Sequence, residues 1–421
     1  MVSHLRAGTL LCEALAAAGL LECDWAVAVD LKNGDPQFPG SVSNLRQSAR
    51  GDRPTIHHSI LKPMSTFTLY AKNLRALRSL EWSPRGVSLL VGANGAGKST
   101  VLQALKFLRL AVHRDPAEAV NLAFGGYFDL KNRVAAEHEP IEIGIRIGNL
   151  DLCLRLVSVQ GLTISAEATL HDGVTELFRG DTGGSHLSFL SPLDPVVPDF
   201  ISTIIKMGIF HDPDICSLRG GSNIAHTQVL DSRGTNAITM LRGWFQRRPD
   251  RWRYDFVLTG LRAAFPRLIA DLDFVEAGNT IAAQIYRPGS EMPAHLGSEA
   301  NGVLALLVLL CDLAATEQGG IVAIDEPENS LHPYAIRLFV RLADQLARRN
   351  DLTVVFTTHS PVLLDAFNDK PEQVYVLDGM TEPAPVRLSE LKNPEWLRQF
   401  RLGELYADDG IVSNDDESGC G

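Results

Sequence analysis

Three short apolar runs stand out along the chain, and each has the length of a buried strand. They cover residues 87–91, 321–324 and 353–356. Continuous runs of this kind are typical of parallel strands that are covered on both faces. Two further segments have helical character: residues 100–108 carry apolar positions at helical spacing, and residues 303–314 are apolar on all sides, which predicts a buried helix. Together these elements predict an α/β fold.

A different pattern begins at residue 141. Apolar residues alternate with mostly polar ones over residues 141–147 and again over residues 150–156, as in strands with one covered face. The two-residue loop Gly148–Asn149 has glycine first, which predicts a type II′ hairpin. Such a turn pairs Ile147 with Leu150, so both apolar stripes cover the same core.

The alternation continues in a third run at residues 164–170, which leads into a turn at residues 171–173. An antiparallel meander is therefore predicted. Residues 192–266 instead predict helices joined by loops. They contain no sustained heptads, which argues against a long coiled coil.

The segment between the first apolar strand and the helix after it fits the pattern G-x-x-x-x-G-K-[ST] at every fixed position. Its glycines let the backbone wrap closely around phosphate, and the amides at the helix start point toward it. In this motif Lys98 reaches the β- and γ-phosphates of ATP, and Ser99 ligates Mg²⁺. A chance glycine-rich turn is the alternative, but the flanking strand and helix argue against it. The predicted nucleotide-binding loop consists of Gly92, Ala93, Asn94, Gly95, Ala96, Gly97, Lys98, Ser99 and Thr100.

Two carboxylates, Asp325 and Glu326, follow the second apolar run. Ligands of open α/β sheets bind at this end of the strands. Asp325 is predicted to hold Mg²⁺, and Glu326 to act as general base toward the attacking water. An acidic helix cap is the alternative, because Pro327 follows. With the phosphate loop present, the pair predicts ATP hydrolysis rather than ATP binding alone.

The third apolar run ends in a polar cluster, residues 357–360. His359 in this cluster is predicted to contact the γ-phosphate or the attacking water. A lone histidine at a strand end is more often structural, but its order and spacing after the other motifs favour a function. The predicted catalytic residues are therefore Lys98, Glu326 and His359.

These motifs resemble those of the ATP-binding-cassette (ABC) type ATPases of the SMC, RecF and OLD group. More closely, the chain resembles the compact bacterial AAA-type ATPases of that group, several of which serve in DNA repair or antiphage defence. The resemblance implies an α/β P-loop NTPase of ABC/SMC-head type, with an antiparallel β-lobe and a helical insertion at about residues 116–290. Its most specific element is the string Asp-Glu-Pro-Glu…Leu-His-Pro. The matching stretches are residues 72–77, 92–99, 234–237, 302–307, 325–333 and 358–360.

The family implies that two ATPase heads close face to face on two ATP molecules. Each ATP then lies between the phosphate loop of one head and a Ser-x-Gly signature of the other. Gly302 matches the signature glycine and is predicted to contact ATP in this way, but Ala300 stands where the serine is expected. Ser298 or Asn301 are candidate substitutes. No clear glutamine loop follows the first helix, where residues 124–132 take its place.

Charge is unevenly distributed along the chain. Its net charge of −11 argues against a uniformly basic nucleic-acid binder. Residues 64–115, however, hold eight Lys/Arg against two acids, and residues 240–267 hold seven Arg against two Asp. Arginines alternate with aromatics over residues 244–254, a pattern suited to gripping phosphates and stacking on bases. A helix pair with a solvated face, whose aromatics point to the core, is the alternative.

The remaining composition predicts a cytoplasmic protein with reduced thiols, because its six cysteines form no C-x-x-C pair. No apolar run reaches the ~18–20 residues of a membrane span. Residues 1–63 predict a flexible N-terminal extension, in which residues 8–22 weakly resemble a signal peptide interrupted by Glu13. Residues 64–385 are expected to form the ATPase domain, and residues 386–421 an acidic tail.

Two functions fit these observations. The favoured one is a DNA-linked ATPase that acts as a homodimer with an effector protein. OLD-type nucleases carry a Toprim domain after the ATPase core, whereas about forty residues follow the strand at 374–377 here. DNA cleavage would then fall to a partner nuclease. The alternative is an ATP-gated, transporter-type nucleotide-binding subunit without DNA, which calls for a standard signature and glutamine loop.

Overall fold

The chain divides into two units, Met1–Pro63 and Met64–Gly421. The predicted N-terminal extension, residues 1–63, lies outside the described residues, as do residues 408–421 of the predicted acidic tail. The fold is therefore that of the second unit. The computed structural model describes residues 66–126, 130–136, 138–159, 163–182, 185–210, 212–224, 229–377 and 384–407.

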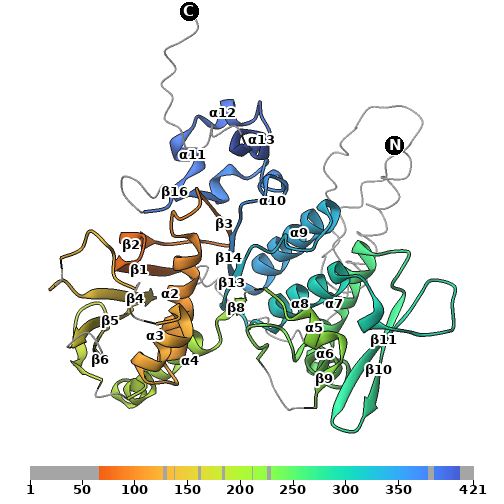
Figure 1. Cartoon of the computed structure of the whole chain (residues 1–421), viewed down its shortest axis with the longest axis horizontal. Coiled ribbons are helices and arrows are strands. Elements are labelled where there is room, and N and C mark those ends of the chain that lie inside the picture. The colour runs from red at the N-terminus through yellow and green to blue at the C-terminus, as the bar shows by residue number, and fades with distance from the viewer. Residues whose placement is uncertain are drawn as a thin grey trace, which may run out of the picture. The chain divides into compact units, whose positions relative to one another are not determined.

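A six-stranded sheet lies at the centre of this unit (Figure 1). Five of its strands are parallel, three of which carry the apolar runs, and the strand at one edge is antiparallel. The predicted buried strands are confirmed, with every residue of the first and third apolar runs buried. In spatial order the strands are β16 (Val386–Arg387), β15 (Val374–Val376), β3 (Val87–Val91), β14 (Thr353–Thr357), β13 (Ile321–Asp325) and β8 (Gly208–Phe210).

Helices cover both faces of this sheet (Figure 1). On one face α2 (Lys98–Ala111) packs against β13 and β8. On the other, α9 (Pro333–Asn350) packs against β3 and β14, and α8 (Asn301–Ala315) lies between α9 and the helices of the insertion. Residues 303–314 of α8 are all buried, which confirms the helix predicted from its all-round apolar pattern.

A second, antiparallel sheet forms the predicted β-lobe. Its hairpin pairs Ile147 with Leu150, as expected, and Gly148 at the first turn position has a φ of 60°. The sheet encloses a core shared with α2, α3 (Pro116–Phe124) and α4 (Val197–Ile205). In spatial order its strands are β2 (Leu77–Trp82), β1 (Phe67–Leu74), β4 (Ile141–Ile147), β5 (Leu150–Val159), β6 (Thr163–His171) and β7 (Glu176–Asp181), and the short helix η1 (Leu187–Leu193) follows.

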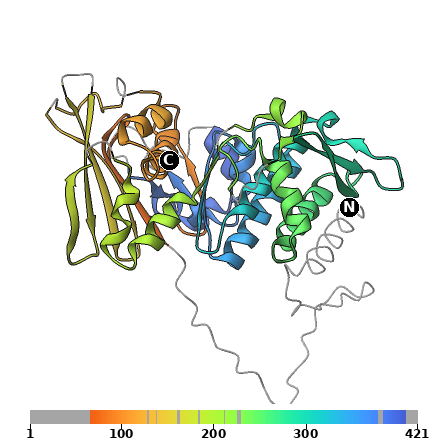
Figure 2. The ribbon, with the colours of Figure 1, turned by 90° about the horizontal axis from the view of Figure 1, so that it is seen from below.

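The helical insertion packs on the side of the central sheet away from the β-lobe, and Figure 2 shows its β-hairpin projecting there. The helices predicted for residues 192–266 are present, and in this region the longest has 14 residues. The hairpin after them was not predicted. The elements are α5 (Ile215–Arg219), β9 (Ser222–Asn223), α6 (Ala237–Gln246), η2 (Arg248–Asp250), α7 (Arg251–Ala264), β10 (Asp271–Ala277), β11 (Thr280–Tyr286), β12 (Ala294–His295) and η3 (Leu296–Ser298).

The chain stays folded beyond residue 386, where the acidic tail was expected to begin. That expectation is wrong up to Ala407, because three leucines of this stretch are buried: Leu388, Leu397 and Leu402. None of the helices within the described ranges is both long and apolar enough to cross a membrane. The C-terminal elements are α10 (Pro361–Asp365), η4 (Pro371–Gln373), α11 (Leu388–Leu391), α12 (Pro394–Leu397) and α13 (Leu402–Ala407).

Candidate active site

The phosphate loop joins β3 to α2, as predicted. Three of its glycines have backbone angles that other residues rarely adopt, with φ of 155° at Gly92, 83° at Gly95 and 107° at Gly97. Side chains would not fit either: a Cβ at Gly97 would lie 2.8 Å from the Leu77 side chain, and one at Gly92 would lie 2.2 Å from the Leu377 carbonyl oxygen. The loop geometry therefore requires glycine at these positions.

The start of α2 is open to an anion. No side chain of the described residues caps its first turn, so the backbone amides keep their hydrogen-bonding capacity. Ala93, Asn94 and Ser99 are exposed on the loop surface. Thr100 is buried, with 7% of its surface exposed, and its side chain packs inward. The loop thus offers amides, a hydroxyl and a positive helix end to the same space.

Lys98 is held beneath the loop. Its Nζ donates hydrogen bonds to the carbonyl oxygens of Gly92, at 2.7 Å, and Ala93, at 3.1 Å. Burial lowers the pKa of Lys98 to about 8, and the negative charges of Glu326 and Asp325 oppose that shift. The ammonium group is therefore already within electrostatic reach of both predicted acids.

The acid pair lies at the carboxyl end of β13, next to the end of β14. Asp325 is paired in register with Thr357, whose hydroxyl donates to the Asp325 carboxylate. Glu326 has a φ of 47°, an unusual conformation for a residue with a side chain. Its backbone N–H donates to the Thr357 carbonyl oxygen at 3.2 Å, which holds this turn. The Glu326 side chain is 40% exposed and so faces solvent rather than the core.

His359 is brought to the same edge. Its Nε2 lies 3.9 Å from Oε1 of Glu326. Burial lowers the pKa of His359, and the positive charge of Lys98 adds to this effect against the opposing charges of Glu326 and Asp325. The lowered pKa favours the neutral form of the ring. The four residues predicted from three separate motifs thus lie together.

Two residues that support the site were missed by the sequence analysis. The Thr358 hydroxyl donates to Oε1 of Glu328, and Thr358 also accepts from the Ser360 amide at 2.8 Å. Burial raises the pKa of Glu328, and its Oε2 has no hydrogen-bond partner within the described part of the chain. The hydrogen bond between Thr358 and Glu328 connects the turn after β14 to the turn after β13. Both residues stand inside the quoted motifs, which is the signal that could have found them.

A third missed residue comes from far along the chain. Tyr406 on α13 places its hydroxyl 3.1 Å from the Gly92 carbonyl oxygen and 3.4 Å from Nδ1 of His359. No pattern in the sequence marks it, because it lies in the stretch that was expected to be an acidic tail. Its position follows only from the packing of α13.

The signature-like segment lies apart from the phosphate loop, against the loop after β13. A Cβ at Gly302 would lie 2.8 Å from the carbonyl oxygen of Ser330. Ala300 precedes α8 and gives its first turn no side-chain cap. Arg219 donates to the Gly297 carbonyl and, at 2.7 Å, to Oδ1 of Asn301. The side chain of Asn301 is thus engaged by an arginine of the same chain.

Comparison with known proteins identifies the family. The family described as "AAA domain, putative AbiEii toxin, Type IV TA system" matches residues 87–150 and 184–365, more than half of the chain. The chain belongs to this AAA-domain family. The matched ranges include the phosphate loop, the acid pair and His359.

This AAA-domain protein is similar to a curated nuclease in sequence and to a solved SMC head in fold. It is 36% identical over 339 residues to an OLD nuclease of Thermus scotoductus (strain ATCC 700910 / SA-01), covering 70% of this chain and 59% of the relative. The chain thus spans about three fifths of that protein. Its fold is similar to that of an SMC head crystallised with the C-terminal winged-helix domain of ScpA. That match has a TM-score of 0.51 and 12% identity, and covers 78% of this chain and 100% of the SMC head. The protein therefore has an SMC-head-type P-loop fold.

The arginine-rich segment of this AAA-domain protein is only partly free for a ligand. Arg251 stacks on the ring of Phe245, with its Cζ 4.2 Å from the ring centre, and pairs with Asp255 at 3.3 Å. Arg253 donates to the Ala314 carbonyl, and 17% of its side chain is exposed. Burial lowers its pKa. Arg253 is therefore packed into the protein and not available to nucleic acid, while other arginines of the segment remain at the surface.

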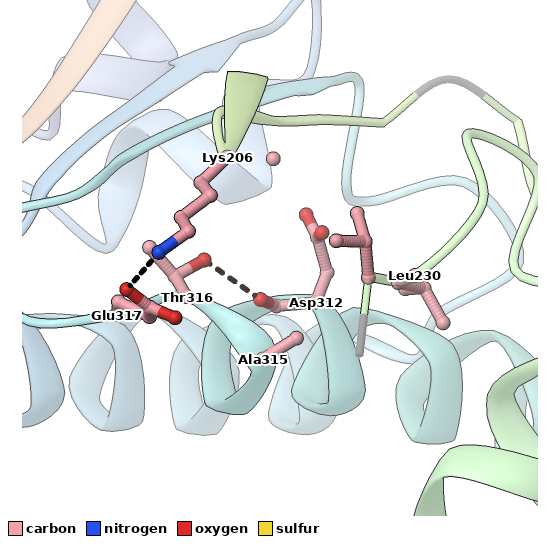
Figure 3. A pocket seen from close by; sticks show the side chains of 8 residues that line it. Lys206, Leu230, Asp312, Ala315, Thr316 and Glu317 are labelled. Carbon is pink, nitrogen blue, oxygen red and sulfur yellow. Dashed lines mark hydrogen bonds and ion pairs between the residues drawn. The ribbon is translucent and has the colours of Figure 1, made fainter. Parts of the chain in front are cut away.

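A small pocket lies away from the active site, beside β8 and the C-terminal end of α8 (Figure 3). Lys206 and Glu317 form an ion pair at 2.7 Å on one side of it. The Asp312 carboxylate points into the pocket in Figure 3 and packs against Gly208, where a Cβ would lie 3.0 Å from Oδ1. Oδ2 of Asp312 has no hydrogen-bond partner among the described residues. Burial raises the pKa of Asp312 to about 7, against the opposing charge of Arg109.

We expect Asp312→Asn to change the pH dependence of stability. The folded protein keeps Asp312 protonated up to about pH 7, whereas the unfolded chain loses this proton near pH 4. Stability therefore falls as pH rises from about 4 to 7, by at most about 1.4 kcal/mol per pH unit. The asparagine variant lacks this loss, so thermal unfolding should show its stability rising relative to wild type between about pH 4 and 7. Asp369→Asn, at an exposed position, is the control; an equal difference at every pH would contradict the account.

Proposed function

We propose that this AAA-domain protein binds ATP at the phosphate loop and hydrolyses it with the help of Mg²⁺. The observation that carries the proposal is the meeting of Lys98, Asp325, Glu326 and His359 at the carboxyl ends of the parallel strands of the central sheet. An ATP phosphate fits the loop, because the glycine turns and the first amides of α2 form a cradle without side chains. In open α/β sheets this is the edge at which ligands bind.

The residues of the site have distinct roles in the proposed reaction. Glu326 takes a proton from a water molecule whose oxygen attacks the γ-phosphorus. The bond between the γ-phosphorus and the bridging oxygen breaks, and ADP leaves with the electron pair. Lys98 leaves its two carbonyl partners to neutralise the phosphate oxygens, and His359 orients the water or the γ-phosphate.

Magnesium suits the oxygen donors at this edge. Ser99 and Asp325 would hold it, since hydroxyl and carboxylate oxygens are ligands that Mg²⁺ prefers. Ser99 is exposed at the start of α2, and the Thr357 hydroxyl fixes the Asp325 carboxylate. When bound, the ion neutralises phosphate charge during transfer.

We further propose that two copies of the chain act together and that the ATPase serves DNA. The SMC-head fold and the OLD nuclease relative support this, as does the signature-like turn at Gly302 that lies away from its own phosphate loop. The relative is a nuclease, so we propose that the ATPase works together with a nuclease as its effector. Adding single- or double-stranded DNA should raise the rate of phosphate release. Purification from native cells, followed by mass spectrometry, should yield a co-purifying nuclease.

The DNA contact can be tested at the exposed arginines. Arg247 has 61% of its side chain exposed, and Arg248 beside it is also exposed. If both neutralise phosphates, Arg247→Ala/Arg248→Ala should weaken DNA binding and lower the slope of log affinity against log salt by about 2. Fluorescence anisotropy at several salt concentrations measures both quantities. An unchanged affinity and slope would leave this segment as a packed lid and move the search to the basic residues of 64–115.

The matched control is Arg337→Ala/Arg341→Ala. These arginines are exposed on α9 and carry the same charge. They lie outside the arginine-rich segment. If the control variant loses as much DNA affinity as Arg247→Ala/Arg248→Ala, then net charge, and not the surface around Arg247 and Arg248, decides binding.

A further inference from the structure

Helix α13 is firmly seated on α10, the helix that follows His359. The backbone N–H of Leu402 donates to Oδ1 of Asn368, and that of Gly403 donates to Oδ1 of Asp365, both at 2.9 Å. A Cβ at Gly403 would lie 2.4 Å from the Pro361 carbonyl oxygen, so the two helices touch backbone to backbone. The position of α13 is therefore tied to the turn that carries His359.

The packing of α13 on α10 brings the Tyr406 hydroxyl to two parts of the active site. Tyr406 donates to the Gly92 carbonyl oxygen at 3.1 Å, and its oxygen lies 3.4 Å from Nδ1 of His359. The same Gly92 carbonyl accepts the 2.7 Å hydrogen bond from Lys98. Tyr406 thus links the first residue of the phosphate loop to the histidine at the neighbouring strand end.

The number of protons available to this contact favours one tautomer of the His359 ring. A phenol has one proton, and here it is donated to the Gly92 carbonyl. Both contacts can be hydrogen bonds at the same time only if Nδ1 of His359 carries the hydrogen and donates it to the phenol oxygen, and we infer this tautomer. The hydrogen bond at one ring nitrogen sets the role of the other. Nε2, which lies 3.9 Å from Glu326, is left as the acceptor in the neutral ring.

We propose that Tyr406 is a positioning residue of the ATPase site, which sets the orientation and tautomer of His359 and holds the first carbonyl of the phosphate loop. This inference rests on the proposed hydrolysis of ATP. It gives α13 a part in turnover without contact to the reacting atoms. The nitrogen of His359 that faces Glu326 is then presented to the attacking water as an acceptor.

The test uses Tyr406→Phe in the full-length chain, which keeps the ring and removes only the hydroxyl. We expect kcat to fall about tenfold, the effect of losing one hydrogen bond in the transition state. KM for ATP should change by less than about twofold, because the loop amides and Lys98 remain. In ¹⁵N-histidine NMR, signals that vanish in His359→Gln identify His359, and these should shift in Tyr406→Phe.

Two further variants separate positioning from general stability. Tyr70→Phe is the control: its hydroxyl donates to Asp151 and contacts the Leu152 carbonyl, but it lies in the β-lobe. It should keep wild-type kcat and wild-type His359 signals. Gly403→Ala should displace α13 and reproduce the lower kcat and the shifted His359 signals with Tyr406 intact.

Three results would overturn the inference. The first is a Tyr406→Phe variant with wild-type kcat and unchanged His359 signals. The second is an equal fall of kcat in Tyr406→Phe and Tyr70→Phe. The third is a rise in KM with no change in kcat, which would make Tyr406 part of ATP binding. If the wild type releases no phosphate, the proposed function fails, and the His359 signals alone then decide whether Tyr406 positions the ring.

Discussion

Glu326→Gln should lower steady-state ATP hydrolysis by about 10²–10³-fold and leave ATP bound, since removal of one preorganised catalytic contact typically costs that much. The amide is almost the same size as the carboxylate but cannot take the proton of the attacking water. The hydrogen bond from the Glu326 amide to Thr357 involves only the backbone and should persist. Phosphate release and the affinity for a fluorescent ATP analogue measure the two effects separately.

The control for this variant is Glu317→Gln. Glu317 is a comparably exposed glutamate, 55% against 40%, and pairs with Lys206 far from the phosphate loop. A surface ion pair contributes little to stability, so we expect wild-type turnover. Equal turnover in Glu326→Gln and wild type would remove Glu326 as the base and leave His359 as the next candidate.

The same Glu326→Gln variant should dimerise when ATP and Mg²⁺ are present. Each head supplies half of a composite site, and the signature-like turn at Gly302 packs against Ser330 rather than against its own phosphate loop. Because the variant does not turn ATP over, the closed state should accumulate. Sedimentation velocity should show about twice the monomer mass with ATP, and the monomer with ADP, under otherwise identical conditions.

A variant that stays monomeric at micromolar protein and saturating ATP would contradict the two-headed model. Ala300 would then be the residue to change first, because it stands where the family signature has serine and leaves the first turn of α8 without a side-chain cap. Ala300→Ser in the Glu326→Gln background should restore dimerisation if the missing hydroxyl is the cause. No dimer in that double variant either would place the contact elsewhere.

The parts of the fold that depend on local patterns could be predicted from the sequence. The hairpin at Gly148 follows from one glycine between two alternating runs, and the buried α8 from its all-round apolar pattern. The meeting of Lys98, Asp325 and His359 follows because parallel strands end at the same edge of a sheet. The catalytic roles of these residues stay predictions.

The parts that depend on long-range packing could not be predicted. β8 has three residues, too few to show any periodicity, and it forms only by pairing with β13. The burial of Arg253 depends on a carbonyl of α8 some sixty positions away. Tyr406 reaches the phosphate loop only because α13 docks on α10. The acidic residues after Tyr406 led to the prediction of an acidic tail for the whole segment from residue 386, although residues up to Ala407 are folded.

The most direct test is phosphate release from ATP by the purified wild-type chain, with Mg²⁺ and with EDTA, beside Lys98→Met. Lys98 is the residue that joins the phosphate loop to the acid edge. If the chain hydrolyses ATP at this site, release should be sustained with Mg²⁺ and should fall to the background level with EDTA and in the variant. Equal release by wild type and Lys98→Met, or none from wild type with or without DNA, would contradict this account.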